Sequence, residues 1–333
     1  MLKSLIDRVL STPDSPTADL YFRNACGDFL GKGVRQFGPT VFASKTACLV
    51  MRHDRRAGPL PRRRRLIYFV DDDVDAGLND ESLPFLYRQK LRWVEHLTAQ
   101  RLRRFAGVAV VGSPALARLF RPVMQTHLLR PFWSETYAGL GHFDALEAGE
   151  GWIEVAYLGS SVHRADLQFL LPVIGRLLAA NPRLRFHLPE RHVLPRGFDR
   201  HPRVRRIRGL GWTAYRREIT TRQFHVALYP LLETPFNRAR SPNKLIEHAI
   251  VGAAPLYSES WAESHRVAQG RTGLCLANDP QIWLEALTEL IGSPQSMRAL
   301  ARGAQETAAR LNNGTPQRAL WRELLDLGEP TFA

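Results

Sequence analysis

The chain has 333 residues, a length that predicts two globular domains rather than one. Hydrophobic residues make up 44% and charged residues 23%, which is close to the average of folded proteins and excludes a disordered, collagen-like or coiled-coil chain. Lys and Arg number 46 against 32 Asp and Glu, which gives a formal net charge of +14. An anionic partner, either a polyanion or an acidic membrane surface, is therefore expected.

The three cysteines, Cys26, Cys48 and Cys275, lie far apart in the sequence, and none forms a CxxC pair. This usage predicts neither a zinc cluster nor a disulfide framework and indicates a reducing, cytoplasmic compartment. The N-terminal sequence MLKSLIDRVL carries an Asp and an Arg within a short apolar pattern, which predicts an amphipathic helix rather than a signal peptide. The longest apolar stretch, residues 105–120, is interrupted by polar residues and falls short of the ~20 apolar residues of a spanning helix. We therefore expect a soluble protein, or one that binds to a membrane face.

Two series of short apolar runs alternate with longer helical patterns, which is typical of parallel sheets covered by helices. In the first half we predict a helix over about 84–104 and strands over 19–23, 46–51, 66–70, 107–111 and 127–130. In the second half we predict strands over 153–158, 184–188, 204–208, 225–229, 254–257 and 273–276, and helices over 165–180, 213–222, 242–251, 280–291, 294–311 and 315–327.

A glycine-rich stretch between the two series predicts a linker. We expect an N-terminal Rossmann-like domain over 1–134, a linker over 135–152 and a second Rossmann-like domain over 153–314. The segment 315–333 is expected to pack back on the first domain as a helix. The predicted fold class is therefore α/β, with two parallel-sheet domains that face each other across a cleft. Ligands of such sheets bind beyond the carboxyl ends of the strands, so residues directly after each strand are the first candidates for function.

The helix predicted near residue 242 has unusually clear boundaries. Ser241 is a good N-cap residue, Pro242 suits the first helical position, and Gly252 stands where a C′ glycine belongs. Lys244 falls in the first turn, where the partial positive charge of the helix dipole disfavours a cation by ~0.3–1 kcal/mol. The cation at this position therefore needs an explanation.

Arg238 and Arg240 bring further positive charge to the start of the same helix. An anion bound there would reverse all three penalties, and helix N-termini are ready phosphate sites, so the pattern predicts a bound phosphate. Glu247 lies three residues after Lys244 and four after Asn243, so it shares their face, and a carboxylate one turn deeper suits the hydroxyls of a ribose. An ordinary Lys–Glu pair on a solvated helix explains this spacing equally well.

The sequence PLLETPFNRARSPNKLIEHAIVGAAPLYSES, residues 230–260, resembles the nucleotide-sugar-binding segment of GT-B glycosyltransferases, particularly bacterial family 4 and related group 1 enzymes. The shared features are a strand that ends in a Pro-Leu pair, a small acidic loop, a Phe-Asn turn, Ser, Lys and Glu at a helix start, and a Gly before the next strand. The separation of Glu233 from Glu247 is longer than in the commonest form of the motif. Carried over by position, the resemblance implies that Glu247 binds the donor ribose. It places near the transferred sugar Glu233, Thr234, Phe236 and Asn237, and near the diphosphate Ser241, Asn243 and Lys244.

Two further segments agree with this resemblance. Residues 155–188 resemble the first strand-turn-helix unit of the family's C-terminal domain, which implies donor contacts from Gly159, Ser160, His163 and Arg164. His163 and Asp166 are also explained as capping residues, because Asp near a helix start is favoured without any ligand. Residues 211–219 resemble the region that borders the nucleobase, which implies that Trp212 or Tyr215 stacks on the base. A place in the core explains Trp212 nearly as well.

Asp71, Asp72 and Asp73 follow a predicted strand in the first half. Three adjacent carboxylates suit a divalent metal, a catalytic base or a solvated turn. The resemblance implies that no metal is needed, because GT-B enzymes usually neutralise the leaving diphosphate with a helix dipole and basic side chains. We expect the cluster at the cleft wall, with Asp72 as the best candidate base if the reaction inverts the anomeric centre.

A basic region begins with the RRRR run at 62–65 and continues in the predicted helix with Arg88, Lys90, Arg92, Arg101, Arg103 and Arg104. It suits contact with anionic lipid, to which each cation near the surface contributes about 1 kcal/mol. A solvated arginine-rich face explains the same residues.

The resemblance implies a glycosyltransferase, the cysteine usage indicates a cytoplasmic one, and the basic region suits peripheral contact with the inner face of the cell membrane. It moves a sugar from a nucleotide-diphosphate donor to a saccharide or lipid-linked saccharide in envelope polysaccharide or glycolipid synthesis, with retention at the anomeric carbon. Lys244 and Arg240 are the expected stabilisers of the departing diphosphate. The alternative is an inactive GT-B-like module that binds a nucleotide sugar or an anionic glycan. No nucleic-acid-binding motif is recognised, so nucleic acid is not an expected partner.

Overall fold

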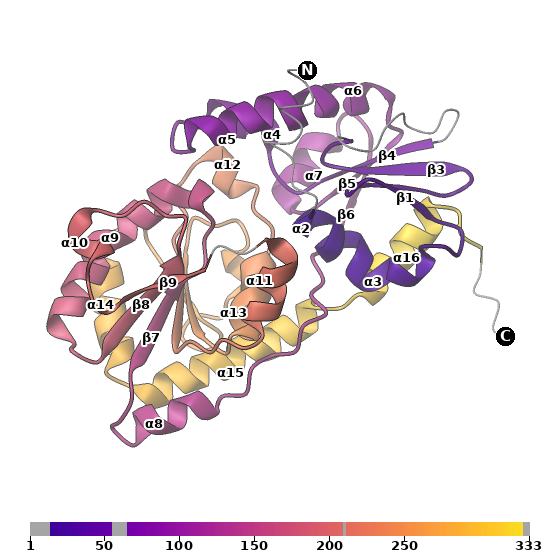
Figure 1. Ribbon diagram of the computed structural model, residues 1–333. Coiled ribbons are helices and arrows are strands. Elements are labelled where there is room, and N and C mark those ends of the chain that lie inside the picture. The colour runs from indigo at the N-terminus through magenta and orange to yellow at the C-terminus, as the bar shows by residue number, and fades with distance from the viewer. Residues whose placement is uncertain (1–13, 55–64, 209–210, 329–333) are drawn as a thin grey trace.

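The computed structural model describes residues 14–54, 65–208 and 211–328, which form two six-stranded sheets with helices packed around them (Figure 1). The amphipathic helix predicted at the N-terminus and residues 62–64 of the arginine run lie outside the described residues.

The first sheet has the strand order β1-β2-β3-β4-β5-β6. The strands β3 to β6 are parallel, whereas β1 and β2 form an antiparallel extension at one edge. Every residue of β3 and β5 is buried, as expected for strands covered by helices on both faces. The strands are β1 (Arg35–Phe37), β2 (Val41–Ala43), β3 (Ala47–Met51), β4 (Arg65–Val70), β5 (Val108–Val111) and β6 (Gln125–Leu128).

The strand predicted over 19–23 is wrong, because these residues form a π-helical turn that continues a short helix. Leu20, Tyr21 and Phe22 are all buried, and a short run that is apolar on every side does not distinguish a buried strand from a buried helix. The strands β1 and β2 were not predicted. The helices of this half are α2 (Pro16–Ala18), η1 (Asp19–Arg23), α3 (Asn24–Cys26), η2 (Gly27–Phe29), α4 (Val74–Asn79), α5 (Phe85–Lys90), η3 (Leu91–His96), α6 (Leu97–Phe105) and α7 (Pro114–Phe120).

The second sheet is parallel throughout, with the order β12-β11-β10-β7-β8-β9. All six strands predicted for this half are confirmed, with small differences at their ends. They are β7 (Ile153–Tyr157), β8 (Leu184–Pro189), β9 (Val204–Ile207), β10 (Val226–Tyr229), β11 (Ala254–Ser258) and β12 (Leu274–Leu276).

The long helices of the second half agree closely with the sequence pattern. Asp279 and Ser293 accept backbone N–H groups at the starts of α14 and α15, and a proline occupies the first position of each helix. The stretch predicted as a linker contains two short helices, whose residues Phe143 and Leu146 are buried in the core of this half. The helices are η4 (Gly141–Phe143), α8 (Asp144–Glu147), η5 (Ser161–His163), α9 (Arg164–Ala180), α10 (Arg196–Asp199), α11 (Trp212–Ile219), α12 (Pro235–Arg238), α13 (Asn243–Ile250), η6 (Ser264–Arg266), α14 (Pro280–Ile291), α15 (Pro294–Leu311) and α16 (Thr315–Leu324).

The last helix, α16, returns to the first half of the chain and contacts α3 and η1 (Figure 1). The indole of Trp321 is fully buried there and donates a hydrogen bond to the carbonyl of Tyr21 at 2.6 Å. Gln317 donates to the carbonyls of Leu20 and Arg130. One apolar cluster contains residues of both halves, so the two sheets are held against each other by side chains as well as by the connecting chain.

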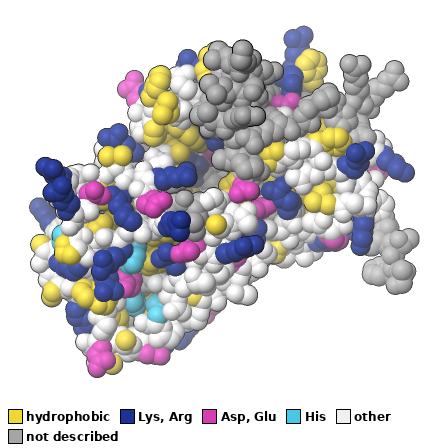
Figure 2. Space-filling view, in the orientation of Figure 1, with side chains coloured by type: hydrophobic (Ala, Val, Ile, Leu, Met, Phe, Trp, Pro, Cys, Tyr) yellow, Lys and Arg dark blue, Asp and Glu magenta, His cyan; other side chains and the backbone are white. Residues whose placement is uncertain are grey.

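Lys and Arg side chains are spread over both halves in Figure 2, with Asp and Glu among them, rather than gathered on one patch of the visible face. Within the described ranges, no helix combines the length and the apolar character that crossing a bilayer requires.

Candidate functional site

The carboxyl ends of the two sheets meet at an ion pair. Asp72 follows β4 of the first sheet, and Arg240 lies in the segment between α12 and α13 that follows β10 of the second. The Arg240 guanidinium donates to the Asp72 carboxylate at 2.6 Å, and the two side chains are 17% and 5% exposed. The contact thus joins two elements from opposite halves at the edge where α/β sheets bind ligands.

Arg52 binds three carboxylates beneath this ion pair. Its guanidinium lies 3.0 Å from Asp71, 2.7 Å from Asp72 and 2.7 Å from Glu95. The backbone of Arg52 has a φ of 63°, a conformation that is uncommon for residues other than glycine. Sequence analysis missed Arg52, since nothing in the local pattern indicates that its partners lie directly after β4 and on η3.

The three adjacent aspartates have different surroundings. Burial alone raises the pKa of a carboxyl, but the guanidiniums of Arg240 and Arg52 lower the pKa of Asp72 to about 2. Burial raises the pKa of Asp71, whose carboxylate also accepts the hydroxyl of Thr17 at 2.8 Å. Asp73 caps α4 by accepting the Ala76 N–H at 3.0 Å, and burial raises its pKa. No group of three or more His, Cys, Asp or Glu among the described residues is arranged to hold a metal ion.

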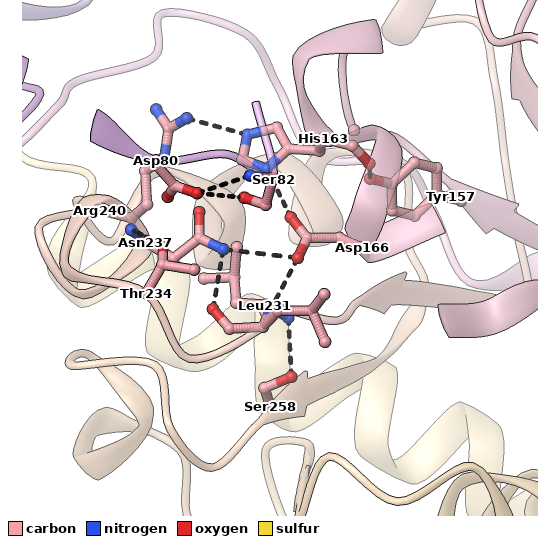
Figure 3. A network of polar contacts seen from close by, with 12 residues as sticks. Asp80, Ser82, Tyr157, His163, Asp166, Leu231, Thr234, Asn237, Arg240 and Ser258 are labelled. Atoms are coloured by element: carbon pink, nitrogen blue, oxygen red, sulfur yellow. Dashed lines mark hydrogen bonds and ion pairs between the residues drawn. The ribbon is translucent and has the colours of Figure 1, made fainter. Parts of the chain in front are cut away.

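A series of hydrogen bonds continues from Arg240 to other residues of the second half (Figure 3). Arg240 donates to Nε2 of His163 at 3.0 Å, so this nitrogen is an acceptor and the imidazole is neutral. Nδ1 of His163 therefore carries the proton and donates it to Asp166 at 2.7 Å. Burial, and then the charge of Arg240, lower the pKa of His163.

Asp166 accepts three hydrogen bonds in this network. It is buried, and it accepts the backbone N–H of Leu232 at 2.8 Å and the side-chain amide of Asn237 at 3.4 Å. Asp166 stands in the first turn of α9, so these hydrogen bonds tie the loop after β10 to that helix. His163 occupies the N-cap position of α9 but makes no side-chain capping hydrogen bond, so the capping interpretation is not confirmed for it, whereas Asp166 does lie in the first turn of that helix.

Phe236 of α12 packs against residues of the first half. Its ring is 1% exposed and belongs to an apolar cluster with Val74, Leu83 and Leu91, while the Arg240 guanidinium lies over its face at 4.4 Å. A Cβ atom at Gly77 of α4 would lie 2.9 Å from this ring. Phe236, expected near the transferred sugar, thus packs between the two halves.

Lys244 and Glu247 form an ion pair within α13, and their side chains are 14% and 4% exposed. Lys244 also donates to the carbonyl of Leu158 at 2.8 Å, at the end of β7. The hydroxyl of Tyr215 donates to Glu247, and burial together with this carboxylate raises the pKa of Tyr215. Asn243 accepts the indole N–H of Trp133 at 2.7 Å, which sequence analysis did not predict.

The charge pattern at the start of α13 requires a correction. Each of the three cations has a carboxylate partner in the protein, since Arg238 pairs with Glu233, Arg240 with Asp72 and Lys244 with Glu247. These partners offset the unfavourable helix dipole, so the dipole argument by itself does not require a bound anion.

The predicted boundaries of α13 are only partly right. The helix begins at Asn243, and Pro242 occupies the cap position, so Ser241 is not the N-cap residue and makes no capping hydrogen bond. Gly252 has a φ of 67° one residue after the C-cap, which confirms the predicted C′ glycine.

Several predicted donor-binding residues lie outside the buried polar cluster. Glu233 is exposed in its pair with Arg238, and Ser160 and Arg164 are exposed near the start of α9. The indole N–H of Trp212 donates to Asp19 at 2.7 Å, so this side chain joins the two halves. Gly159 is buried, and a Cβ atom there would lie 2.3 Å from the hydroxyl of Tyr157, so no larger residue fits.

Comparison with known proteins gives similarity in structure alone. No protein-family model matches the chain, and no curated protein sequence is similar to it. The solved structure of HepE from Anabaena, in complex with UDP and glucose, is similar with a TM-score of 0.56, 14% identity and coverage of 79% of this chain and 72% of that chain. Sucrose-phosphate synthase from Thermosynechococcus elongatus gives a TM-score of 0.57, 16% identity and coverage of 80% and 69%. WaaG, a glycosyltransferase involved in lipopolysaccharide biosynthesis, gives a TM-score of 0.55 at 15% identity, with coverage of 78% of this chain and 77% of that chain.

These similarities show the fold. The chain consists of two α/β, Rossmann-like halves arranged as in GT-B glycosyltransferases, as the resemblance of residues 230–260 predicts.

Proposed function

We propose that the chain is a glycosyltransferase that takes its sugar from a nucleotide-diphosphate donor. The observation that carries this proposal is the meeting of both sheets' carboxyl ends at the pair Asp72–Arg240, with Lys244 and Glu247 beside β7 in the same half as Arg240. The arrangement belongs to a fold shared with HepE, which was crystallised with UDP and glucose, and with WaaG. A UDP-sugar is therefore the first donor to test.

In this proposal the donor replaces contacts that the protein makes with itself. The diphosphate takes the guanidinium of Arg240 from Asp72 and the ammonium of Lys244 from Glu247, because a diphosphate carries more charge than a carboxylate. Glu247, held by the Tyr215 hydroxyl, then accepts the ribose hydroxyls. The same two cations stabilise the charge that develops when the sugar departs.

The reaction forms one bond and breaks one. The oxygen of an acceptor hydroxyl bonds to the anomeric carbon, and the bond from that carbon to the diphosphate oxygen breaks with its electron pair moving to the diphosphate. For retention, the acceptor proton passes to the leaving phosphate oxygen, so no side-chain base is needed. Arg52 stays beside Asp72 when the diphosphate takes Arg240, and its charge still lowers the pKa of Asp72, which disfavours this carboxylate as a base. The products are a nucleoside diphosphate and the glycoside.

The acceptor in this proposal is a saccharide or lipid-linked saccharide of envelope polysaccharide or glycolipid synthesis, and the protein works at the inner face of the cell membrane without a metal. Phe85 and Leu86, which are 63% and 75% exposed on α5, lie on the element that also carries Arg88 and Lys90 and suit such a surface.

The test begins with a thermal-shift screen of the purified protein against UDP, GDP, dTDP and CMP and continues with calorimetry on the best ligand. We expect Lys244→Met and Glu247→Gln to weaken nucleotide binding strongly. Because both side chains are buried, these near-isosteric changes are preferred to alanine, which would also destabilise the fold. The exposed Lys45→Met and Glu289→Gln are the controls. Unchanged affinity in both site variants would remove the assignment, whereas binding without transfer or donor hydrolysis would favour an inactive binding module.

A further inference from the structure

Residues of the first half of the chain, Asp72 among them, line a pocket of about 330 Å³. It lies between α4, α6 and α7, and its volume is in the range of small-molecule sites. Its lining residues are of two chemical kinds. Its polar lining is Asp72, Asp73, Asp75 and Arg103, and its apolar wall is formed by Leu116, Leu119, Phe120 and Val123 together with Ala76.

The polar end of the pocket is continuous with the candidate functional site. Asp72 lines the pocket and also binds Arg240, so a hydroxyl placed here points toward the proposed diphosphate site. In the described part of the chain no cation forms an ion pair with Asp73, whose carboxylate also accepts the N–H that it caps on α4. A carboxylate has about four acceptor positions on its two oxygens, so Asp73 can also accept a sugar hydroxyl.

The apolar wall does not suit a saccharide. Burying hydroxyl groups against aliphatic side chains without hydrogen bonds costs free energy. The Phe120 ring is no free platform for a sugar, since it packs against Tyr68 at 6.1 Å and is covered by the Arg103 guanidinium at 5.1 Å. Arg103 is itself paired with Asp75, so these two lining charges partly neutralise each other.

The apolar wall continues onto the surface of the protein. Leu119 and Val123 line the pocket and are nevertheless 55% and 67% exposed. A ligand that follows this wall can therefore leave the pocket at its outer end. The apolar wall, its open end and the acidic inner end together fit an amphipathic molecule whose sugar end faces Arg240.

We propose that this pocket is the acceptor site and that the acceptor carries an apolar, chain-like aglycone. The hydroxyl that attacks the donor lies at Asp72 and Asp73, and the aglycone lies along Leu116, Leu119 and Val123. This inference rests on the proposed transferase function and narrows its acceptor to saccharides with an apolar tail.

The test compares methyl and n-octyl glycosides of glucose, galactose, mannose and N-acetylglucosamine by calorimetry, below the concentration at which the octyl compounds form micelles. Each buried methylene group contributes roughly fourfold in affinity, so a chain that occupies the pocket should bind at least tenfold more tightly than its methyl counterpart. Leu119→Asp and Val123→Asp should reduce this preference to less than threefold. Val193→Asp is the matched control, because Val193 is 81% exposed on the second half of the chain.

The outcomes separate the two proposals. If no octyl glycoside binds better than its methyl counterpart, or if the preference survives in both pocket variants, the acceptor assignment is wrong even when nucleotide binds normally. A preference that Val193→Asp also abolishes is non-specific and overturns it as well. If no nucleotide binds to the wild-type protein, the transferase function fails first, and the acceptor assignment fails with it.

Discussion

Arg240 and Asp72 are separated by more than half of the chain, yet a charge-assisted hydrogen bond of 2.6 Å joins them between the two sheets. Arg52 holds the second oxygen of the same carboxylate at 2.7 Å. The closed arrangement of the two halves therefore includes a buried carboxylate between two guanidiniums, and any separation of the halves at this point has to break one of its ion pairs.

We expect Asp72→Ala to destabilise the protein by about 3–5 kcal/mol, because removing one partner of a buried ion pair leaves charges uncompensated. The measurement is the free energy of unfolding in urea. The exposed pair Asp199–Arg206 provides the control, and Asp199→Ala should cost less than about 1 kcal/mol. Equal losses in the two variants would show that burial adds nothing to the Asp72 pairs.

The milder change Asp72→Asn should strengthen the binding of UDP. In the unliganded protein the carboxylate competes with the diphosphate for Arg240, and a hydrogen bond to a charged group contributes about 1.5–3 kcal/mol. Neutralising this competitor should therefore raise the affinity for UDP by roughly ten- to a hundredfold, measured by calorimetry at constant ionic strength. Weaker binding in Asp72→Asn would mean that Asp72 orients Arg240 for the nucleotide instead of competing with it.

Acid should destabilise the protein through buried neutral histidines. Nδ1 of His225 accepts the Glu154 N–H and Nε2 donates to the His142 carbonyl, both at 3.0 Å, and burial lowers the pKa of His225 to about 4. Between that value and the unfolded pKa of about 6.5, the unfolded chain binds a proton that the folded chain does not, so stability falls as pH falls.

Protonation of His225 in the unfolded chain should lower the free energy of unfolding by about 2 kcal/mol between pH 7 and pH 5. Urea unfolding at the two pH values should therefore show a smaller loss in His225→Asn than in the wild type. His53, whose pKa burial also lowers to about 4, remains in both proteins and cancels in this comparison. Identical losses would place the acid sensitivity elsewhere.

The sequence patterns predicted those parts of the structure that depend on neighbours along the chain. The starts of α14 and α15, the C′ glycine after α13 and the shared face of Lys244 and Glu247 follow from caps and helical spacing. A run such as residues 19–23 could not be assigned, because a short stretch that is buried on all sides has no periodicity.

The sequence predicted which segments contribute to the site, but it did not predict which side chains contact each other there. The residues after β4 and β10 were correctly singled out as strand-end candidates, but their pairing was not predicted. The partners of Arg52 and Arg240 are set by how the two sheets face each other, and no local spacing encodes this. The cations near α13 therefore pointed to a missing anion, although carboxylates of the protein already neutralise them.

Gly77→Ala provides a test of the contact between the two halves. Replacing Gly by Ala inside a helix normally stabilises by up to about 1 kcal/mol. Here the added Cβ would lie 2.6 Å from Leu91 and 2.9 Å from the Phe236 ring, so it would force α12 away from α4. We expect a net loss of about 1–3 kcal/mol, as for other overpacked sites. Gly197→Ala in α10 is the matched control, because a Cβ atom there has no neighbour within 4 Å, and it should be neutral or stabilising. A stable Gly77→Ala protein would show that α12 and α4 are not packed as described.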